Sequence, residues 1–228
     1  MSVSRRLIAK LELTHGALNE ASAPLWSGPD GGALYGEYLA SLHGVARGAM
    51  WLMMRALERC EELSEIGDPV AAGLTPFLRH HIPEEWGHDG WLLEDIAALG
   101  GDSERVRAQP PSATIAAMCG AQLWWIEHAH PVAFLGHAEV LECSPPELEM
   151  LDEFEQRTGV PAAAMRFFRR HAVIDQRHRD EIHHTLDSLP LGPEQEALIG
   201  VSALHTAGML IRLCDELRVS GGEPIQQV

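Results

Sequence analysis

The sequence predicts an all-α protein with seven to nine helices. β-Branched residues are scattered, and the alternation of apolar and polar residues that is typical of strands never persists. Apolar residues instead recur at helical spacing, and this pattern is interrupted only by short groups of glycine and proline. We therefore expect a helical bundle without a sheet.

The glycine and proline groups divide the chain into consecutive helices. Gly100 follows an apolar run as a helix C-cap does, and Pro161 stands where the first turn of a helix tolerates proline. Pro83 and Pro131 each remove a backbone donor, so we expect each to kink or restart a helix. The expected helices span residues 3–22, 33–63, 68–81, 83–99, 112–129, 131–143, 146–158, 161–187 and 194–218.

Composition and charge restrict the protein class. The chain has 228 residues, 46% of them hydrophobic, which suits one domain over residues 1–228 with a tail that frays after about residue 218. A net charge of −16 disfavours nucleic acid and anionic membrane surfaces as partners. No apolar run reaches the ~18 residues of a membrane span, and no signal-type core follows the first residues.

Cysteine usage agrees with a reducing compartment. The four cysteines form no CxxC pair, so free thiols in the cytoplasm are the expected state. We expect a small-molecule substrate, no nucleic acid and no membrane partner, and we leave a homodimer open.

The segment from His171 to His178 carries the strongest functional signal. On a helix, Asp175 lies about 40° around the axis from His171, and His178 lies about 20° to the other side. Two imidazoles and a carboxylate therefore share one stripe. A solvated surface helix is the alternative interpretation, because arginine and acidic residues flank the stripe. The two interpretations are compatible if one face of the helix is buried and the other is exposed to solvent. Buried imidazole and carboxylate groups need partners, and a metal ion is one such partner.

Two further segments supply candidate ligands. Glu85 and His88 form a carboxylate–x–x–His pair, for which Glu84 or His81 is an alternative source of the first ligand. The helix expected after Pro131 is largely apolar and carries Glu139 and Glu142, either of which can bridge two metals. An exposed helix end is the alternative for Glu142. Carboxylates and imidazoles without a thiolate favour iron first and manganese second over structural zinc.

These motifs resemble the heme-oxygenase-like di-iron oxidases, also called iron-containing redox enzymes. The resemblance covers about residues 34–189 and rests on the order E-x-x-H, an apolar helix ending in Leu-Glu, and H-x3-D-x2-H. It implies a heme-oxygenase-like bundle of about seven core helices that binds two Fe(II) ions and reacts with O2. The metal ligands that it implies are Glu85, His88, Glu142, His171, Asp175 and His178. Many members place a glutamate seven residues before the histidine, where this chain has His81.

The implied activity is O2-dependent oxidation of a small substrate. Members of the family catalyse N-oxygenation or oxidative C–C cleavage, and an external electron donor is a possible partner. We expect His171, Asp175 and His178 to hold one iron, Glu142 to bridge, and Glu85 with His88 to complete the other. Fold relatives give two rivals, a metal-independent enzyme like TenA or pyrroloquinoline-quinone synthase, and a heme protein that uses His15.

The substrate expectation rests on two features. Arg170 and Arg177 flank the ligand stripe and can bind a carboxylate, which favours an amino-acid-like substrate over a fatty acid. We expect a cavity beside the metals with aromatic and methionine walls, although such residues are more often plain core. The expected wall residues are Trp51, Met53, Met54, Trp124 and Trp125.

Overall fold

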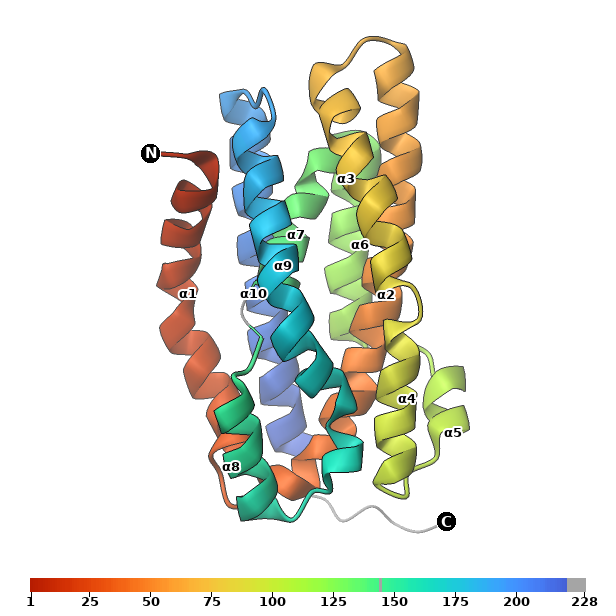
Figure 1. The fold of residues 1–228 in the computed structure, drawn as a ribbon, viewed down its shortest axis with the longest axis vertical. Coiled ribbons are helices and arrows are strands. Elements are labelled where there is room, and N and C mark those ends of the chain that lie inside the picture. Colours follow the sequence, from red (N-terminus) through yellow and green to blue (C-terminus); the bar gives the residue numbers. More distant parts are fainter. Residues whose placement is uncertain (144, 221–228) are drawn as a thin grey trace.

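The computed structural model describes residues 1–143 and 145–220, with side chains through residue 218. The α-helices are α1 (Val3–Trp26), α2 (Gly31–Glu65), α3 (Pro69–Glu85), α4 (His88–Ala98), α5 (Ser103–Ala108), α6 (Ala113–His128), α7 (Phe134–Glu142), α8 (Leu148–Thr158), α9 (Arg166–Ser188) and α10 (Pro193–Ser220) (Figure 1). Two short 3-10 helices are η1 (Pro131–Ala133) and η2 (Ala162–Ala164). No strand occurs in the described ranges, which confirms the predicted all-α class. Most of the expected tail, residues 221–228, lies outside the described residues.

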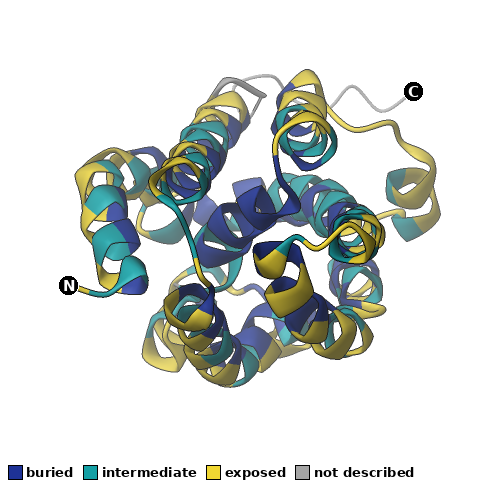
Figure 2. Ribbon diagram, turned by 90° about the horizontal axis from the view of Figure 1, so that it is seen from above, coloured by how far each residue is buried: buried dark blue, intermediate teal, exposed yellow. Residues whose placement is uncertain are grey.

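The helix α7 lies in the middle of the bundle. Its residues 134–139 are all buried, and it packs against α9 and α10. The long helices surround it with their buried faces inward and their exposed faces outward, as Figure 2 shows. The other large contacts join α10 to α1 and α6, and α2 to α3, α4 and α6. The last three residues of α7, 140–142, are half-buried, so a ligand at this end lies at the margin of the enclosed interior.

One described helix is long and apolar enough to cross a membrane, the segment Pro193–Arg218 of α10. In the bundle, this helix packs against α1, α6 and α7, and Ile199, Ala203 and Ala207 belong to the main hydrophobic core. A core helix of a folded bundle passes the same test of length and composition. The segment is therefore weak evidence for a membrane span.

The break between α3 and α4 lies later than the sequence indicates. Pro83 is inside the last turn of α3 and does not restart a helix there. The chain instead turns at Trp86 and Gly87, and Gly87 adopts a left-handed φ of 89°. Glycine enters this region without the steric penalty of a Cβ atom. The expected helix at 83–99 is therefore wrong at its start, and Glu85 and His88 belong to different helices.

The short helix α5 was not expected from the sequence. Its N-terminus is capped by Asp102, whose side chain accepts a hydrogen bond from the backbone N–H of Arg105 at 2.9 Å. The helix has only six residues and buries none of them, so it carries no apolar stripe by which it could be recognised.

Asp95 of α4 fixes the start of α9. Its buried carboxylate accepts hydrogen bonds from the backbone N–H groups of Phe167 at 2.9 Å and Arg166 at 3.2 Å. The N-cap residue of α9, Met165, provides no side-chain cap, so Asp95 takes that role from a neighbouring helix. Burial raises the pKa of Asp95 to about 6 although these two hydrogen bonds oppose the shift. This contact sets the position of α9 against α4, and hence of His171 against His88.

Candidate metal centre

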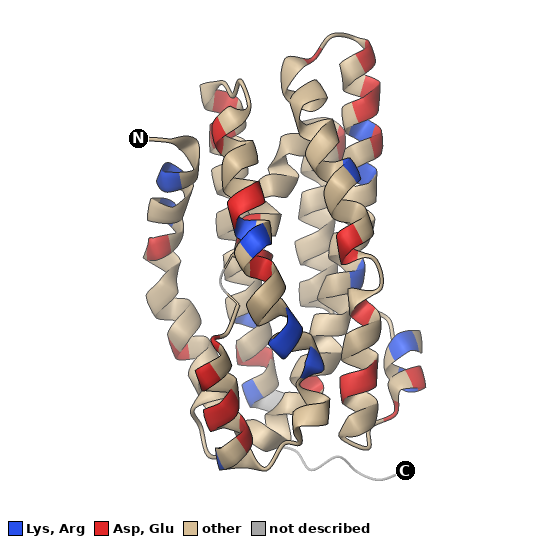
Figure 3. Ribbon diagram, in the orientation of Figure 1, with Lys and Arg blue, Asp and Glu red and all other residues tan. Residues whose placement is uncertain are grey.

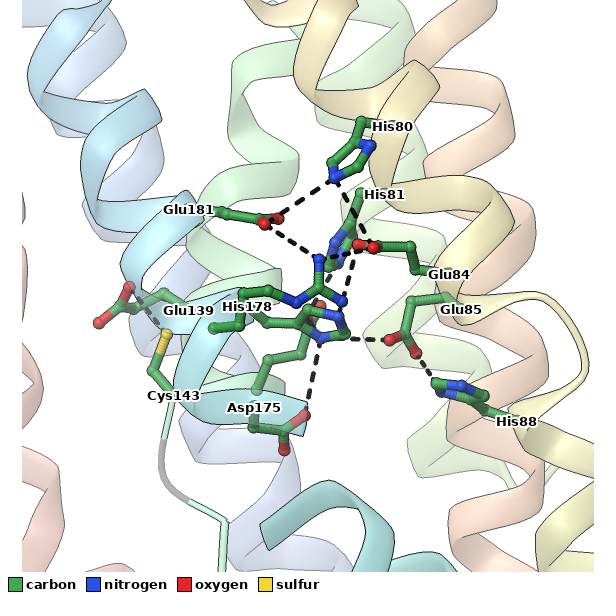
Figure 4. A network of polar contacts seen from close by, with 12 residues as sticks. His80, His81, Glu84, Glu85, His88, Glu139, Cys143, Asp175, His178 and Glu181 are labelled. Atoms are coloured by element: carbon green, nitrogen blue, oxygen red, sulfur yellow. Dashed lines mark hydrogen bonds and ion pairs between the residues drawn. The ribbon is translucent and has the colours of Figure 1, made fainter. Parts of the chain in front are cut away.

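The six predicted ligands lie close to one another inside the bundle, and Figure 4 labels Glu85, His88, Asp175 and His178 among them. Four helices bring them together: Glu85 ends α3, His88 begins α4, Glu142 ends α7, and the other three lie on α9. His81 of α3 joins them. Two groups of possible ligand atoms result, and Glu85 belongs to both.

The first group surrounds His178, which has no exposed surface. Its Nδ1 atom lies 3.2 Å from Oε2 of Glu142 and 3.3 Å from Oε1 of Glu85. Nε2 of His81 lies 2.9 Å from the same oxygen of Glu142. Oδ1 of Asp175 is 3.7 Å from the same Nδ1 atom of His178. Two imidazoles and two carboxylates thus converge within the reach of a single ion.

The second group consists of Glu85, His88 and His171. Nδ1 of His88 lies 3.0 Å from Oε2 of Glu85, and the rings of His88 and His171 meet edge to face at 5.0 Å between centroids. Nδ1 of His171 donates a hydrogen bond to the carbonyl of Phe167 at 2.8 Å. This bond leaves Nε2 as the ligand atom of His171, the arrangement usual for metal-binding histidine.

The grouping differs from the expected one. We expected His171 and His178 to share one ion with Glu142 as the bridge, but the structure puts the two histidines in different groups and Glu85 in both. Seven residues advance about 10 Å along a helix. That separation exceeds the distance between two ligands of one ion, so a shared angular stripe does not imply a shared metal.

Buried polar atoms without partners test whether a metal fits this region. A buried polar atom normally has a hydrogen bond, because an unpaired one costs free energy. Several atoms here have no hydrogen-bond partner among the described residues: Nδ1 of His81, Oε1 of Glu85, Oδ1 of Asp175 and both ring nitrogens of His178. Their concentration in one place fits a bound cation.

The carboxylates show the same need for positive charge. Burial, followed by the nearby charges of Glu142 and Glu85, raises the pKa of Asp175 to about 9. Burial alone would also raise the pKa of Glu142, but the imidazoles of His178 and His81 lower it instead. A divalent cation favours the ionised form of every carboxylate that it contacts. The donor set, oxygen and nitrogen without sulfur, suits iron or manganese.

Glu139 lies outside both groups. Its two oxygens contact Nε2 of His183 at 3.0 Å and the thiol of Cys143 at 3.3 Å. Of the two glutamates that the sequence left open on this helix, Glu142 is therefore the one that faces the predicted ligands. Glu84 lies at the edge of the region and is paired with Arg177 at 2.5 Å.

The sequence puts Trp91 on the helix face that continues from His88, but it does not reveal that the two rings are in contact. The ring of Trp91 stacks on that of His88 at 3.9 Å between centroids, and the guanidinium of Arg170 lies 4.4 Å above the Trp91 ring. The only available signal was the spacing of three residues from His88, which puts Trp91 on the same helix face. Trp91 shields one side of His88 from water.

Two other expectations do not agree with the structure. The expected cavity walls Trp51, Met54 and Trp124 are exposed, so they do not enclose a site beside the ligands. Their helical spacing did not reveal which face was buried. His15, the candidate heme ligand, is exposed on α1. An exposed histidine on an outer helix offers no enclosed heme pocket.

Comparison with known families decides the assignment. The family described as iron-containing redox enzymes matches residues 43–208, which is most of the chain and includes all the predicted ligands. The chain belongs to this family. A search of curated proteins finds no significant match.

Two solved structures are similar to this chain over almost its whole length. A domain of unknown function with a heme oxygenase-like fold from Shewanella denitrificans matches with a TM-score of 0.75 and 20% identity, covering 96% of this chain and 89% of its own. A TenA homologue from Pseudomonas syringae pv. tomato matches with a TM-score of 0.69 and 14% identity, covering 94% and 92%. These likenesses establish the heme oxygenase-like fold and leave the reaction open.

Proposed function

We propose that the protein is a non-heme di-iron oxygenase or oxidase that uses O2. The observation that carries this proposal is the position of Glu85, whose two oxygens face two separate groups of imidazole and carboxylate ligands. A carboxylate between two such groups is the arrangement of di-iron carboxylate proteins. Family membership supports an iron-dependent redox reaction. A pair of ferrous ions supplies the electrons and the binding site that O2 activation requires.

Each ligand has a role that follows from its surroundings. His81, Glu142 and His178 would hold one ion and His88 and His171 would hold the other, and Glu85 belongs to both groups of candidate ligands. Asp175 is 3% exposed and faces the charges of Glu85 and Glu142, so it completes the neutralisation of the ions. Manganese is the second choice of metal. Because the surrounding helices exclude water, charges in the site interact more strongly than they would at the surface.

The substrate is an amino acid or another small carboxylate. Arginines and acidic residues are mixed along α9, as the blue and red segments of Figure 3 show. Arg177 is committed to Glu84 and Glu181, so it does not provide the carboxylate contact expected from the sequence. Arg170 has no ion pair within the described part of the chain and lies over Trp91, beside His88. Its guanidinium can bind a carboxylate and orient the rest of a small molecule toward the metals.

The reaction class determines the other partners. In an N-oxygenation, one oxygen atom of O2 enters the substrate and the other is released as water. This reaction needs two more electrons than the substrate supplies. An external electron donor therefore belongs to this proposal, whereas oxidative C–C cleavage can draw those electrons from the substrate itself. We expect a cytoplasmic enzyme without nucleic-acid or membrane partners, and a homodimer is the assembly to test first.

O2 consumption by iron-loaded protein tests the proposal. Protein loaded with Fe(II) without air is mixed with O2 and a panel of amino acids and fatty acids, with metal-free protein as the control. We expect iron-dependent O2 uptake that one or more amino acids stimulate. Stimulation by medium-chain fatty acids alone would refute the substrate class but leave the metal chemistry. No iron-dependent uptake with any compound would contradict the proposed function.

The likeness to a TenA homologue favours one rival, a metal-independent enzyme. That rival predicts equal turnover of a substrate by the metal-free and the iron-loaded protein. A second rival, heme binding, predicts a Soret band with hemin that His15→Ala removes. The exposure of His15 leads us to expect no such band.

A further inference from the structure

His178 has different neighbours at its two ring nitrogens. Nδ1 faces Glu142 and Glu85 in the first group of ligands, whereas Nε2 points to the opposite side, 3.7 Å from Oε2 of Glu84. The ring is fully buried, and neither nitrogen has a hydrogen-bond partner within the described residues. If Nδ1 binds the metal, Nε2 carries the proton and needs an acceptor. Glu84 is the carboxylate on that side.

Glu84 is held in place from outside. Its Oε1 atom pairs with Nη1 of Arg177 at 2.5 Å and lies 3.6 Å from Nε2 of His80. The same Nη1 atom contacts Oε1 of Glu181 at 3.1 Å, so Arg177 joins α3 to α9 across the edge of the site. Oε2 of Glu84 is buried and has no hydrogen-bond partner in the part of the chain that the structure describes. One oxygen of Glu84 thus faces the surface network and the other faces His178 (Figure 4).

We propose that Glu84 is a positioning residue for His178. It would accept a hydrogen bond from the Nε2–H group of that imidazole, which fixes the ring so that Nδ1 faces the candidate metal position. Metal-binding histidines generally donate their second N–H to a carboxylate or a carbonyl, and the carboxylate also makes the ligand nitrogen more basic. His171 uses the carbonyl of Phe167 in this way. Glu84 is the equivalent partner for His178, and Arg177 holds Glu84.

This inference rests on the proposed metal centre and assigns Glu84 a role that is distinct from that of a ligand. Glu84 is adjacent to Glu85 in the sequence, but the two carboxylates approach opposite nitrogens of His178. Loss of Glu84 should therefore weaken only the ion that His178 holds. The ion held by His88 and His171 should be unaffected, because Glu84 contacts neither residue.

The test is an anaerobic Co(II) titration followed by visible absorption, with the wild type, Glu84→Gln and Glu181→Gln compared. Glu181 is a matched control, because it contacts Arg177 and His80 in the same network but not His178. We expect two ions in the wild type and in Glu181→Gln. In Glu84→Gln one ion should bind normally and the other about 10- to 100-fold more weakly, the usual effect of losing such a partner.

Three results would overturn the role of Glu84: unchanged affinity for both ions in Glu84→Gln, equal weakening of both, or the same loss in Glu181→Gln. A wild type that binds no Co(II) would remove the proposed function together with this role, so the two failures are distinguishable. If Glu84→Gln does not fold, ¹⁵N spectra of the Zn(II)-loaded wild type decide the matter. The proton of His178 must then be found on Nε2, and a proton on Nδ1 contradicts the inference.

Discussion

The continuous helix α9 and the broken connection between α3 and α4 supply ligands in different ways. α9 carries His171, Asp175 and His178 on one uninterrupted helix, so the helical pitch alone fixes their relative positions. Glu85 and His88 instead lie on either side of the left-handed Gly87. A regular helix spreads its ligands over two sites, whereas a break can bring two ligands to within 3.0 Å of each other.

The difference explains why Glu85 belongs to both groups. As the last residue of α3, Glu85 is near His81 and His178 of the first group. The turn at Gly87 then directs His88, the first residue of α4, back toward the second oxygen of Glu85. The helix α9 therefore sets the spacing of the two sites, and the break between α3 and α4 joins them.

The largest effect is expected at the centre of α9. His178→Ala should abolish iron-dependent O2 uptake, because His178 is buried in the first ligand group. His184→Ala should retain most of the uptake, because His184 is exposed on the same helix. Far-UV circular dichroism should show unchanged helix content in both. Equal damage by the two substitutions would mean that the buried face of α9 is incorrectly placed.

A change in pH dependence is expected at Asp175 in the metal-free protein. Its pKa is raised to about 9, so between about pH 4 and pH 9 the folded state holds a proton that the unfolded state has lost. The contribution of Asp175 to the free energy of unfolding is fully present below about pH 4 and is lost as the pH rises toward 9. The slope approaches about 1.4 kcal/mol per pH unit for a single proton.

Asp175→Asn removes this slope. Urea unfolding of chelator-treated protein from pH 5 to pH 8 should show that the variant gains stability relative to the wild type as the pH rises. Parallel stability curves for the two proteins would contradict the assigned environment of Asp175.

A smaller effect is expected at the break. Gly87→Ala should destabilise the protein by about 1–2 kcal/mol, because a Cβ atom disfavours the left-handed backbone. Gly90 is the matched control, since it lies within α4 and a Cβ atom meets nothing within 4 Å at either glycine. Gly90→Ala should stabilise the helix by about 0.5–1 kcal/mol. Thermal unfolding should show a lower melting temperature for Gly87→Ala and a higher one for Gly90→Ala. A change in the same direction for both variants would argue against a left-handed backbone at Gly87.

The smallest effect is expected at Asp95, where α4 contacts the N-terminus of α9. Asp95→Ala removes the cap of α9 and should cost about 1 kcal/mol in the free energy of unfolding. Asp95→Asn retains one acceptor oxygen and should cost less. Urea unfolding of the two variants provides the comparison, and an Asn variant that is less stable than the Ala variant would contradict the capping role.

The sequence predicts most of the fold because the bundle is built from long periodic segments. The helices over α2, α6 and α10 lie within a few residues of their expected bounds. The break at Gly87 was not predicted, because Pro83 is the stronger local signal and a glycine's φ depends on the surrounding fold. The short α5 was missed because it has no buried face.

The sequence indicates the buried face of α9, but it does not indicate how the candidate ligands are grouped. The spacing of His171, Asp175 and His178 identifies a common face, and all three are buried as that face requires. Which ligands share an ion depends on where α3 and α7 cross α9, and the sequence of one helix contains no such information. The role of Trp91 depends in the same way on its packing against His88.

The most direct test of the two joined sites is the number of Fe(II) ions bound per chain, measured by anaerobic equilibrium dialysis and elemental analysis. We expect two ions in the wild type. His178→Ala should lose the ion of the first group, His171→Ala should lose that of the second, and Glu85→Ala should weaken both. A wild type that binds no iron, or a Glu85→Ala variant that still binds two ions with unchanged affinity, would contradict the shared position of Glu85.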